Sequence, residues 1–179
     1  MYPEYAEING KEYKLNTDFK VALECFKIID DPNIGDYERT LAVIYKLFGF
    51  VPKENVDEFL RISRDYLRCG EDETRGNGKN DFSFTHDRKY INASFMSDYH
   101  IDLSKAEIHY WQFCELLSGL TETSVLSKVR EIRNYDMSDI KDTKTRNAIL
   151  RAKESVALPV VRTKEEEEAI KRFEELLKG

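Results

Sequence analysis

The sequence predicts a mainly α-helical protein, a multi-helix bundle with a short β-hairpin at its N-terminus. Two observations predict this fold class. Apolar residues recur with the 3.6-residue period of a helix through most of the chain after residue 16, and strict alternation of apolar and polar residues is confined to residues 5–16. The chain has 179 residues, of which 41% are hydrophobic. That is enough for one domain with a sizeable core, which we expect to span residues 1–159.

The hairpin is predicted around Asn9-Gly10. Apolar and polar residues alternate on both sides of this pair, from Ala6 to Leu15. Asn and Gly accept the positive φ that a type I′ turn needs at both central positions, so the pair favours a two-residue turn.

Three amphipathic helices with short connections are predicted next, and neighbours should pack roughly antiparallel. The first has cap candidates at residues 16–18 and ends before Pro32, the second ends at Gly49, and the third begins after Pro52 and ends at Gly70. Their expected apolar faces are Phe19, Ala22, Leu23, Phe26 and Ile29; Tyr37, Leu41, Ile44, Tyr45 and Phe48; and Val56, Phe59, Leu60, Tyr66 and Leu67.

Residues 70–82 are acidic, rich in Gly and nearly devoid of apolar side chains, which is typical of a flexible surface loop. The pair Gly78-Lys79 suggests a phosphate-binding loop. That motif, however, needs Gly at the position of Glu73 and Ser or Thr at the position of Asn80. A surface loop is therefore the favoured interpretation.

Four more helices are predicted after the loop: one from near Thr85, one from Ser104 to Ser118, a short one near residues 125–132, and a more polar one over residues 139–155. Ser104 and Glu107 have the spacing of a capping box, and we expect the helix behind them to be the most buried, with Trp111 in the core. The expected apolar residues are Tyr90, Ile91, Ser94, Phe95 and Tyr99; Ile108, Tyr110, Trp111, Phe113, Cys114, Leu116 and Leu117; Val125, Leu126, Val129 and Ile132; and Ile140, Ile149 and Leu150.

Residues 160–179 are predicted to form a separate C-terminal amphipathic helix after a break at Pro159. Thr163 and Glu166 have the spacing of a second capping box. A narrow apolar stripe follows on an otherwise charged helix, and such a short helix needs a surface to cover. Either the stripe packs on its own domain, or it docks on a second copy or a partner protein. The candidate partner-binding residues are Ile170, Phe173, Leu176 and Leu177.

Charge excludes some classes of protein. A net charge of −6 argues against a dedicated nucleic-acid binder. No apolar stretch is long enough to cross a membrane, and the N-terminal residues lack the features of a secretion signal, so we expect an intracellular protein.

Residues 125–155 are an exception to the acidic charge of the chain, with 8 Lys and Arg against 5 Asp and Glu. This basic segment could be a solvated helix face, dock on its own domain, or hold an acidic partner.

No catalytic motif is recognisable, so the sequence predicts a non-enzymatic protein with no catalytic, cofactor-binding or metal-ligating residue and no cofactor. The histidines at 86, 100 and 109 have no metal-ligand spacing. Cys25 and Cys114 lie on apolar helical faces and Cys69 at a helix end, which is a poor framework for disulfides.

Several segments, in order, resemble the bacteriophage gene-product-fifteen family. The resemblance covers about residues 5–159, and its most specific part is the aromatic block His109 to Phe113, although Tyr110-Trp111 departs mildly from the usual aromatic pair. The residues that carry it are Asn9-Gly10-Lys11, Asn16 to Phe19, Asp81 to Asp87, Tyr90 to Phe95, Tyr99 to Leu103, His109 to Phe113, Leu116 to Leu120, Ile132 to Asp136, Lys141-Asp142, Arg146-Asn147 and Ala157 to Pro159.

The resemblance implies a tail-module protein of a long-tailed phage or prophage, encoded near the tape-measure gene. Proteins from that position are similar in role to tail assembly chaperones, which bind the tape-measure protein and help to recruit tail-tube subunits. The implied location is the cytoplasm of the bacterial host during phage assembly, with an oligomer possible. Two alternatives stay open: a structural component of the virion tail, and a host-directed regulator or enzyme.

Overall fold

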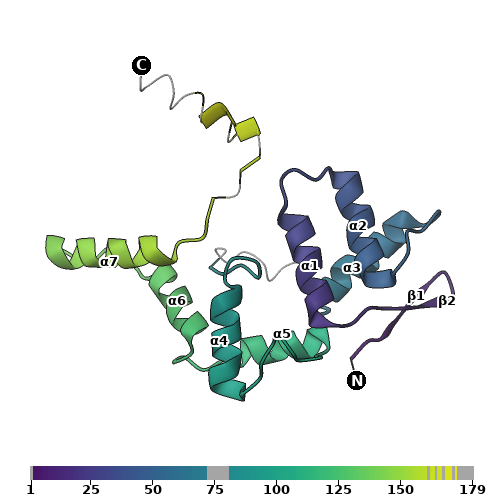
Figure 1. Cartoon of the computed structure of the whole chain (residues 1–179), viewed down its shortest axis with the longest axis horizontal. Coiled ribbons are helices and arrows are strands. Elements are labelled where there is room, and N and C mark those ends of the chain that lie inside the picture. The colour runs from purple at the N-terminus through teal and green to yellow at the C-terminus, as the bar shows by residue number, and fades with distance from the viewer. Residues whose placement is uncertain are drawn as a thin grey trace.

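The computed structural model describes residues 2–71, 81–160, 162, 163, 165, 166, 168–170 and 172, and it confirms a mainly α-helical fold with an N-terminal hairpin (Figure 1). None of the helices in these ranges has the length and apolarity that crossing a membrane requires. The elements in chain order are β1 (Tyr5–Ile8), β2 (Lys11–Lys14), α1 (Phe19–Asp30), α2 (Asp36–Phe48), α3 (Val56–Leu67), α4 (Arg88–Tyr99), α5 (Tyr110–Ser118), α6 (Val125–Asn134) and α7 (Thr143–Val156).

The hairpin forms as the sequence predicts. Strands β1 and β2 pair antiparallel with Ile8 opposite Lys11, and the turn residues Asn9 and Gly10 have φ of 51° and 75°. Ala6 and Ile8 are buried on one face of β1, which packs against α3. Alternation along the strand therefore places one face of the hairpin on the core.

Helices α1 and α2 lie side by side with opposite chain directions, as predicted (Figure 1). Asp18 is the N-cap of α1, where its carboxylate accepts a hydrogen bond from the amide of Lys20 at 2.8 Å. The predicted face of α2 is partly wrong, because Tyr37 and Tyr45 are 67% and 54% exposed. The helix instead buries Val43, Ile44, Leu47 and Phe48, so its buried face is rotated toward positions 43 and 47. Ile29, on the predicted face of α1, is also exposed.

The capping box predicted at Ser104 does not form, and α5 begins at Tyr110. The carboxylate of Asp102 accepts hydrogen bonds from both the amide and the hydroxyl of Ser104, so that hydroxyl is not available to cap a helix. The chain then runs extended beside the start of α1, where Phe19 N–H donates to the carbonyl of Ile108. This pairing across the core keeps residues 106–109 out of a helix.

The core is centred on Phe113 rather than on Trp111. Phe113 is fully buried and stacks on Phe19 and Phe95, with ring centroids 4.9 and 5.1 Å apart. Trp111 is only partly buried, so the expectation that it lies in the core is wrong, and Leu117 is partly buried as well. The Trp111 indole N–H donates to the carbonyl of Tyr66 at 2.9 Å, which holds the amphipathic ring at the edge of the core.

Helix α4 begins at Arg88, after the N-cap Asp87, and α7 begins at Thr143 rather than at residue 139. In α7 the carboxylate of the N-cap Asp142 accepts a hydrogen bond from the amide of Thr145. Helix α7 packs on α6 and projects from the rest of the molecule (Figure 1).

Candidate partner-binding surfaces

The C-terminal segment contains the residues that the sequence proposes for partner binding. Of these, Ile170 is 37% exposed, and Phe173, Leu176 and Leu177 lie outside the described residues. The predicted capping box is present: the amide of Thr163 donates to the Glu166 carboxylate, and the amide of Glu166 donates to the Thr163 hydroxyl. The role of this segment in binding stays a prediction.

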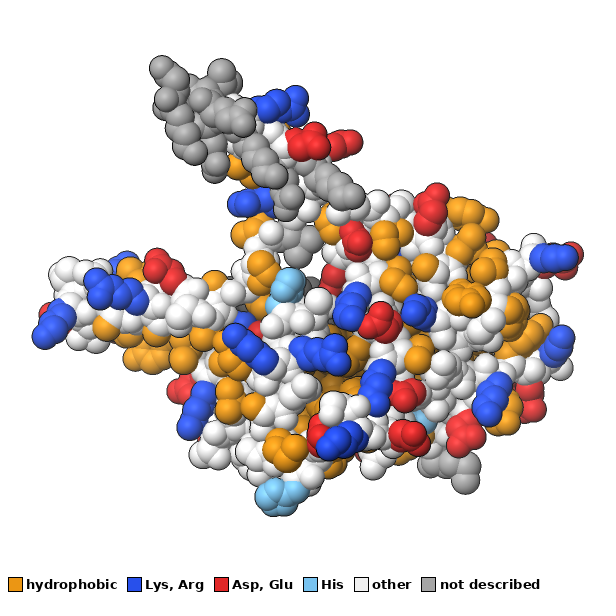
Figure 2. All heavy atoms as spheres, in the orientation of Figure 1, with side chains coloured by type: hydrophobic (Ala, Val, Ile, Leu, Met, Phe, Trp, Pro, Cys, Tyr) orange, Lys and Arg blue, Asp and Glu red, His pale blue; other side chains and the backbone are white. Residues whose placement is uncertain are grey.

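A first exposed surface lies along α6 and α7, which we call the α6–α7 arm. None of the residues of α7, all of which the structure describes, is buried. An apolar hollow of about 330 Å³ opens between the two helices. Leu150 and Tyr135 are 38% and 47% exposed, and apolar side chains follow the lower edge of the arm in Figure 2. The residues that line the hollow are Lys128, Glu131, Ile132, Tyr135, Ile149 and Ala152.

The arm is also basic. The exposed part of α7 carries Lys144, Arg146 and Arg151, and none of the three has an ion pair with a residue that the structure describes. An apolar stripe flanked by cations that have no ion pair among the described residues matches an acidic amphipathic helix better than a second copy of itself, because like charges would face each other in a self-contact.

Arg133 fixes the root of this arm. Its guanidinium donates to both carboxylate oxygens of Asp87, at 2.6 and 2.7 Å, and to the carbonyls of Asp81 and Val156. The Arg133 and Asp87 side chains are only 10% and 2% exposed. Burial alone would raise the pKa of Asp87, but hydrogen bonds from Arg133 and from the Ser83 amide outweigh it and hold the pKa below its ordinary value. A buried, bidentate ion pair therefore joins the N-cap of α4 to α6, and a hydrogen bond from the same guanidinium holds the end of α7.

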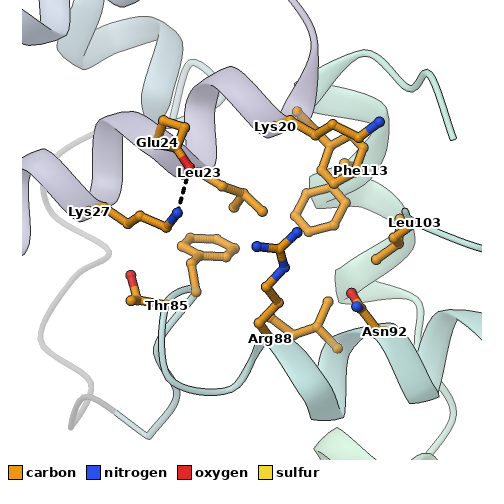
Figure 3. Close-up of a pocket in the computed structure, with 12 residues that line it drawn as sticks. Lys20, Leu23, Glu24, Lys27, Thr85, Arg88, Asn92, Leu103 and Phe113 are labelled. Atoms are coloured by element: carbon orange, nitrogen blue, oxygen red, sulfur yellow. Dashed lines mark hydrogen bonds and ion pairs between the residues drawn. The ribbon is translucent and has the colours of Figure 1, made fainter. Parts of the chain in front are cut away.

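A second surface lies between α1 and α4 and contains a pocket of about 50 Å³, which we call the α1–α4 pocket (Figure 3). Its floor is aromatic, and Phe19, Phe84 and Phe113 all line it. Arg88 reaches from α4 into the centre of the pocket, and Lys20 and Lys27 lie at opposite ends of its α1 wall. In Figure 2 basic and acidic side chains alternate near the middle of the face shown, with apolar side chains between them.

The charges of the α1–α4 pocket are only partly balanced. Lys27 forms an ion pair with Glu24. Lys20 and Arg88 have no ion pair with any described residue, although Lys20 lies 5.6 Å from the centroid of the Phe19 ring. The Thr85 hydroxyl is buried and has no hydrogen-bond partner among the described residues. Beside the Glu24–Lys27 pair, the pocket therefore combines an apolar floor with two cations that form no ion pair within the described part of the chain. This combination suits a carboxylate attached to an apolar segment.

Sequence reasoning did not select the α1–α4 pocket. Lys20, Leu23, Glu24 and Lys27 have the i, i+3, i+4, i+7 spacing of one helix face, so the α1 wall was readable from the sequence. Arg88 is 61 or more residues away from them, and no local pattern connects it to α1. The basic excess of residues 125–155 was the available signal for the α6–α7 arm.

No cluster that could hold a metal ion is present in the described part of the chain. His109 is the N-cap of α5, where its Nδ1 accepts from the amide of Trp111 at 3.1 Å, and His86 and His100 are exposed. Cys25 is buried, which raises the pKa of its thiol to about 12. Interaction with the Cys69 thiol holds the pKa of Cys114 below its ordinary value.

Comparison with known proteins identifies a family. A family model described as Bacteriophage Gp15 protein matches residues 2–158. Comparisons with curated proteins and with solved structures found no match. The matched range ends just after α7, and the C-terminal segment that carries Ile170 lies beyond it.

Proposed function

We propose that this chain, which belongs to the Bacteriophage Gp15 protein family, is a non-enzymatic, chaperone-like tail assembly protein. In this proposal it binds the tape-measure or tail-tube protein in the cytoplasm of the bacterial host while phage particles assemble. The observation that carries the proposal is the α6–α7 arm, whose helix α7 has no buried residue along its described length.

The physical argument concerns what such an arm is for. A helix of 14 residues is marginal alone in water, and α6 is the main packing partner of α7 among the described elements. The buried Arg133–Asp87 pair nevertheless fixes its root to the domain. A rigidly held helix with an uncovered apolar stripe is suited to binding another helix, and the basic residues beside the stripe favour an acidic one. An assembly protein that shields such a segment would keep its partner soluble.

Co-expression tests the proposal. The chain is produced with the tape-measure protein of the same phage or prophage, and soluble yield and co-purification are measured. We expect the wild type to raise the soluble yield and to co-purify. Leu150→Glu and Arg151→Glu should each reduce co-purification at least tenfold. Tyr37→Glu, at a 67% exposed site on α2, is the matched control and should bind like the wild type.

The proposal fails if the arm variants and the control bind alike, or if no tail protein co-purifies. Mass spectrometry of purified particles tests the alternative role. A fixed copy number in the mature virion would support a structural tail component instead of an assembly protein.

A further inference from the structure

The α1–α4 pocket lies beside the point where the C-terminal segment leaves the domain. A neighbouring hollow is lined by Pro159, Val160 and Arg162 of the segment that leaves the domain; the domain contributes Lys27, Asp30, Asp31, Thr85 and His86. Lys27 and Thr85 also line the α1–α4 pocket. The chain that follows Arg162 therefore starts at the edge of this pocket, close to the unpartnered hydroxyl of Thr85.

The chemistry of the segment complements the pocket. Four consecutive glutamates, residues 165–168, follow the capping box at Thr163, and the apolar residues Ile170, Phe173, Leu176 and Leu177 come after them. The pocket offers two cations without an ion pair among the described residues, Lys20 and Arg88, above an aromatic floor. Ile170 is 37% exposed in this conformation, so part of its apolar surface is uncovered.

We propose that the acidic C-terminal helix of the chain docks on the α1–α4 pocket of the same molecule. Its glutamates then face Arg88 and Lys20, and its apolar stripe covers Leu23 and Phe84. This interaction surface does not depend on the proposed function. It is separate from the α6–α7 arm, which stays free to bind a partner.

The dimensions of the segment allow this contact. A helix over residues 163–179 would be about 24 Å long, and Lys27 and Lys20 are separated along α1 by about 10 Å. A helix that starts beside Lys27 and runs toward Lys20 therefore passes the whole α1 wall. Docking within one molecule is favoured over docking on a second copy, because a short connection holds the segment near the pocket at an effective concentration of the order of millimolar.

Zero-length crosslinking with a carbodiimide tests the proposal on the full-length protein. The reagent joins carboxylates to lysine amines that are in contact. In an equal mixture of unlabelled and ¹⁵N-labelled protein, the mass of each crosslinked product distinguishes a contact within one molecule from a contact between two copies. Lys20 is the diagnostic amine, because Lys27 is close to the connection whether or not the helix docks.

We expect crosslinks from Lys20 to glutamates of residues 165–175. In at least nine-tenths of them, both crosslinked peptides should carry the same isotope label. Arg88→Glu should reduce their yield at least fivefold, as should 1 M NaCl. Lys89→Glu is the matched control, because Lys89 is the next residue of α4, does not line the pocket and lies over the Tyr90 ring. The control should keep the wild-type yield.

Three results would overturn the proposal. The absence of Lys20 crosslinks would show that the segment does not reach the pocket. Equal yields in the Arg88 and Lys89 variants would show that the pocket charge does not hold it. If half of the crosslinks joined a labelled peptide to an unlabelled one, the contact would be with a second copy.

Discussion

Removal of the Arg133 guanidinium should destabilise the domain far more than its single ion pair suggests. In Arg133→Ala the Asp87 carboxylate, only 2% exposed, keeps the Ser83 amide but loses the two charged hydrogen bonds that balance its burial. The carbonyls of Asp81 and Val156 also lose their donor. Leaving a buried charge without its partner costs about 3–5 kcal/mol, which for a chain of this length corresponds to a fall in Tm of about 6–20 °C.

Arg130 provides the matched control one helical turn earlier on α6. It pairs with Asp81 at 3.0 Å, but its side chain is 46% exposed. An exposed pair contributes about 0–1 kcal/mol, so Arg130→Ala should change the free energy of unfolding little. Urea unfolding followed by circular dichroism measures both variants. If the free energies of unfolding of Arg133→Ala and Arg130→Ala agree within about 0.5 kcal/mol, which is about the error of such comparisons, the buried network does not stabilise the arm.

Two further predictions concern the core and the response to acid. Phe113→Ala should lower the free energy of unfolding by about 3–5 kcal/mol, and Trp111→Ala by less, because the larger ring is only partly buried; thermal melts that rank the two in the opposite order would contradict a core centred on Phe113. Burial opposes the charge of Asp87, but Arg133 holds its pKa below the ordinary value. The stabilisation that the ionised Asp87 carboxylate contributes should therefore be complete above about pH 5. It should decrease as the pH falls below about 3.9, the pKa of Asp in the unfolded chain, toward the lower pKa of Asp87 in the folded protein. Urea midpoints between pH 3 and 7 should vary less in Asp87→Asn than in the wild type, and an equal slope in both would refute this assignment.

The sequence predicts the fold class and the locally encoded features well. The Asn9-Gly10 turn, the Asp18 cap and the reciprocal bonds of Thr163 and Glu166 all form as their local patterns indicate. Each depends on residues within about four positions of one another, where backbone geometry and hydrogen bonding decide the outcome. The family resemblance is confirmed over residues 2–158.

Features set by contacts between distant segments were not predictable in the same way. The pattern at Ser104 has the form of a capping box, but pairing of residues 108–110 with the start of α1 overrides it. Periodicity alone also could not show which side of α2 faces α1 and α3, since both candidate faces contain apolar residues. The Arg133–Asp87 pair joins residues 46 positions apart, and neither side chain is distinguished in the sequence from other charged residues.

The pairing of α1 with the segment before α5 has a consequence for folding during synthesis. Phe19 stacks on Phe113, and the backbone of residues 17–19 bonds to residues 108–110. His109 extends this connection to the N-terminus, because its Nε2 bonds to the carbonyl of Pro3 across 106 positions. The hairpin and first three helices therefore lack part of their core until residue 113 has left the ribosome. We infer that the chain folds after most of it has been made, as one cooperative unit rather than helix by helix.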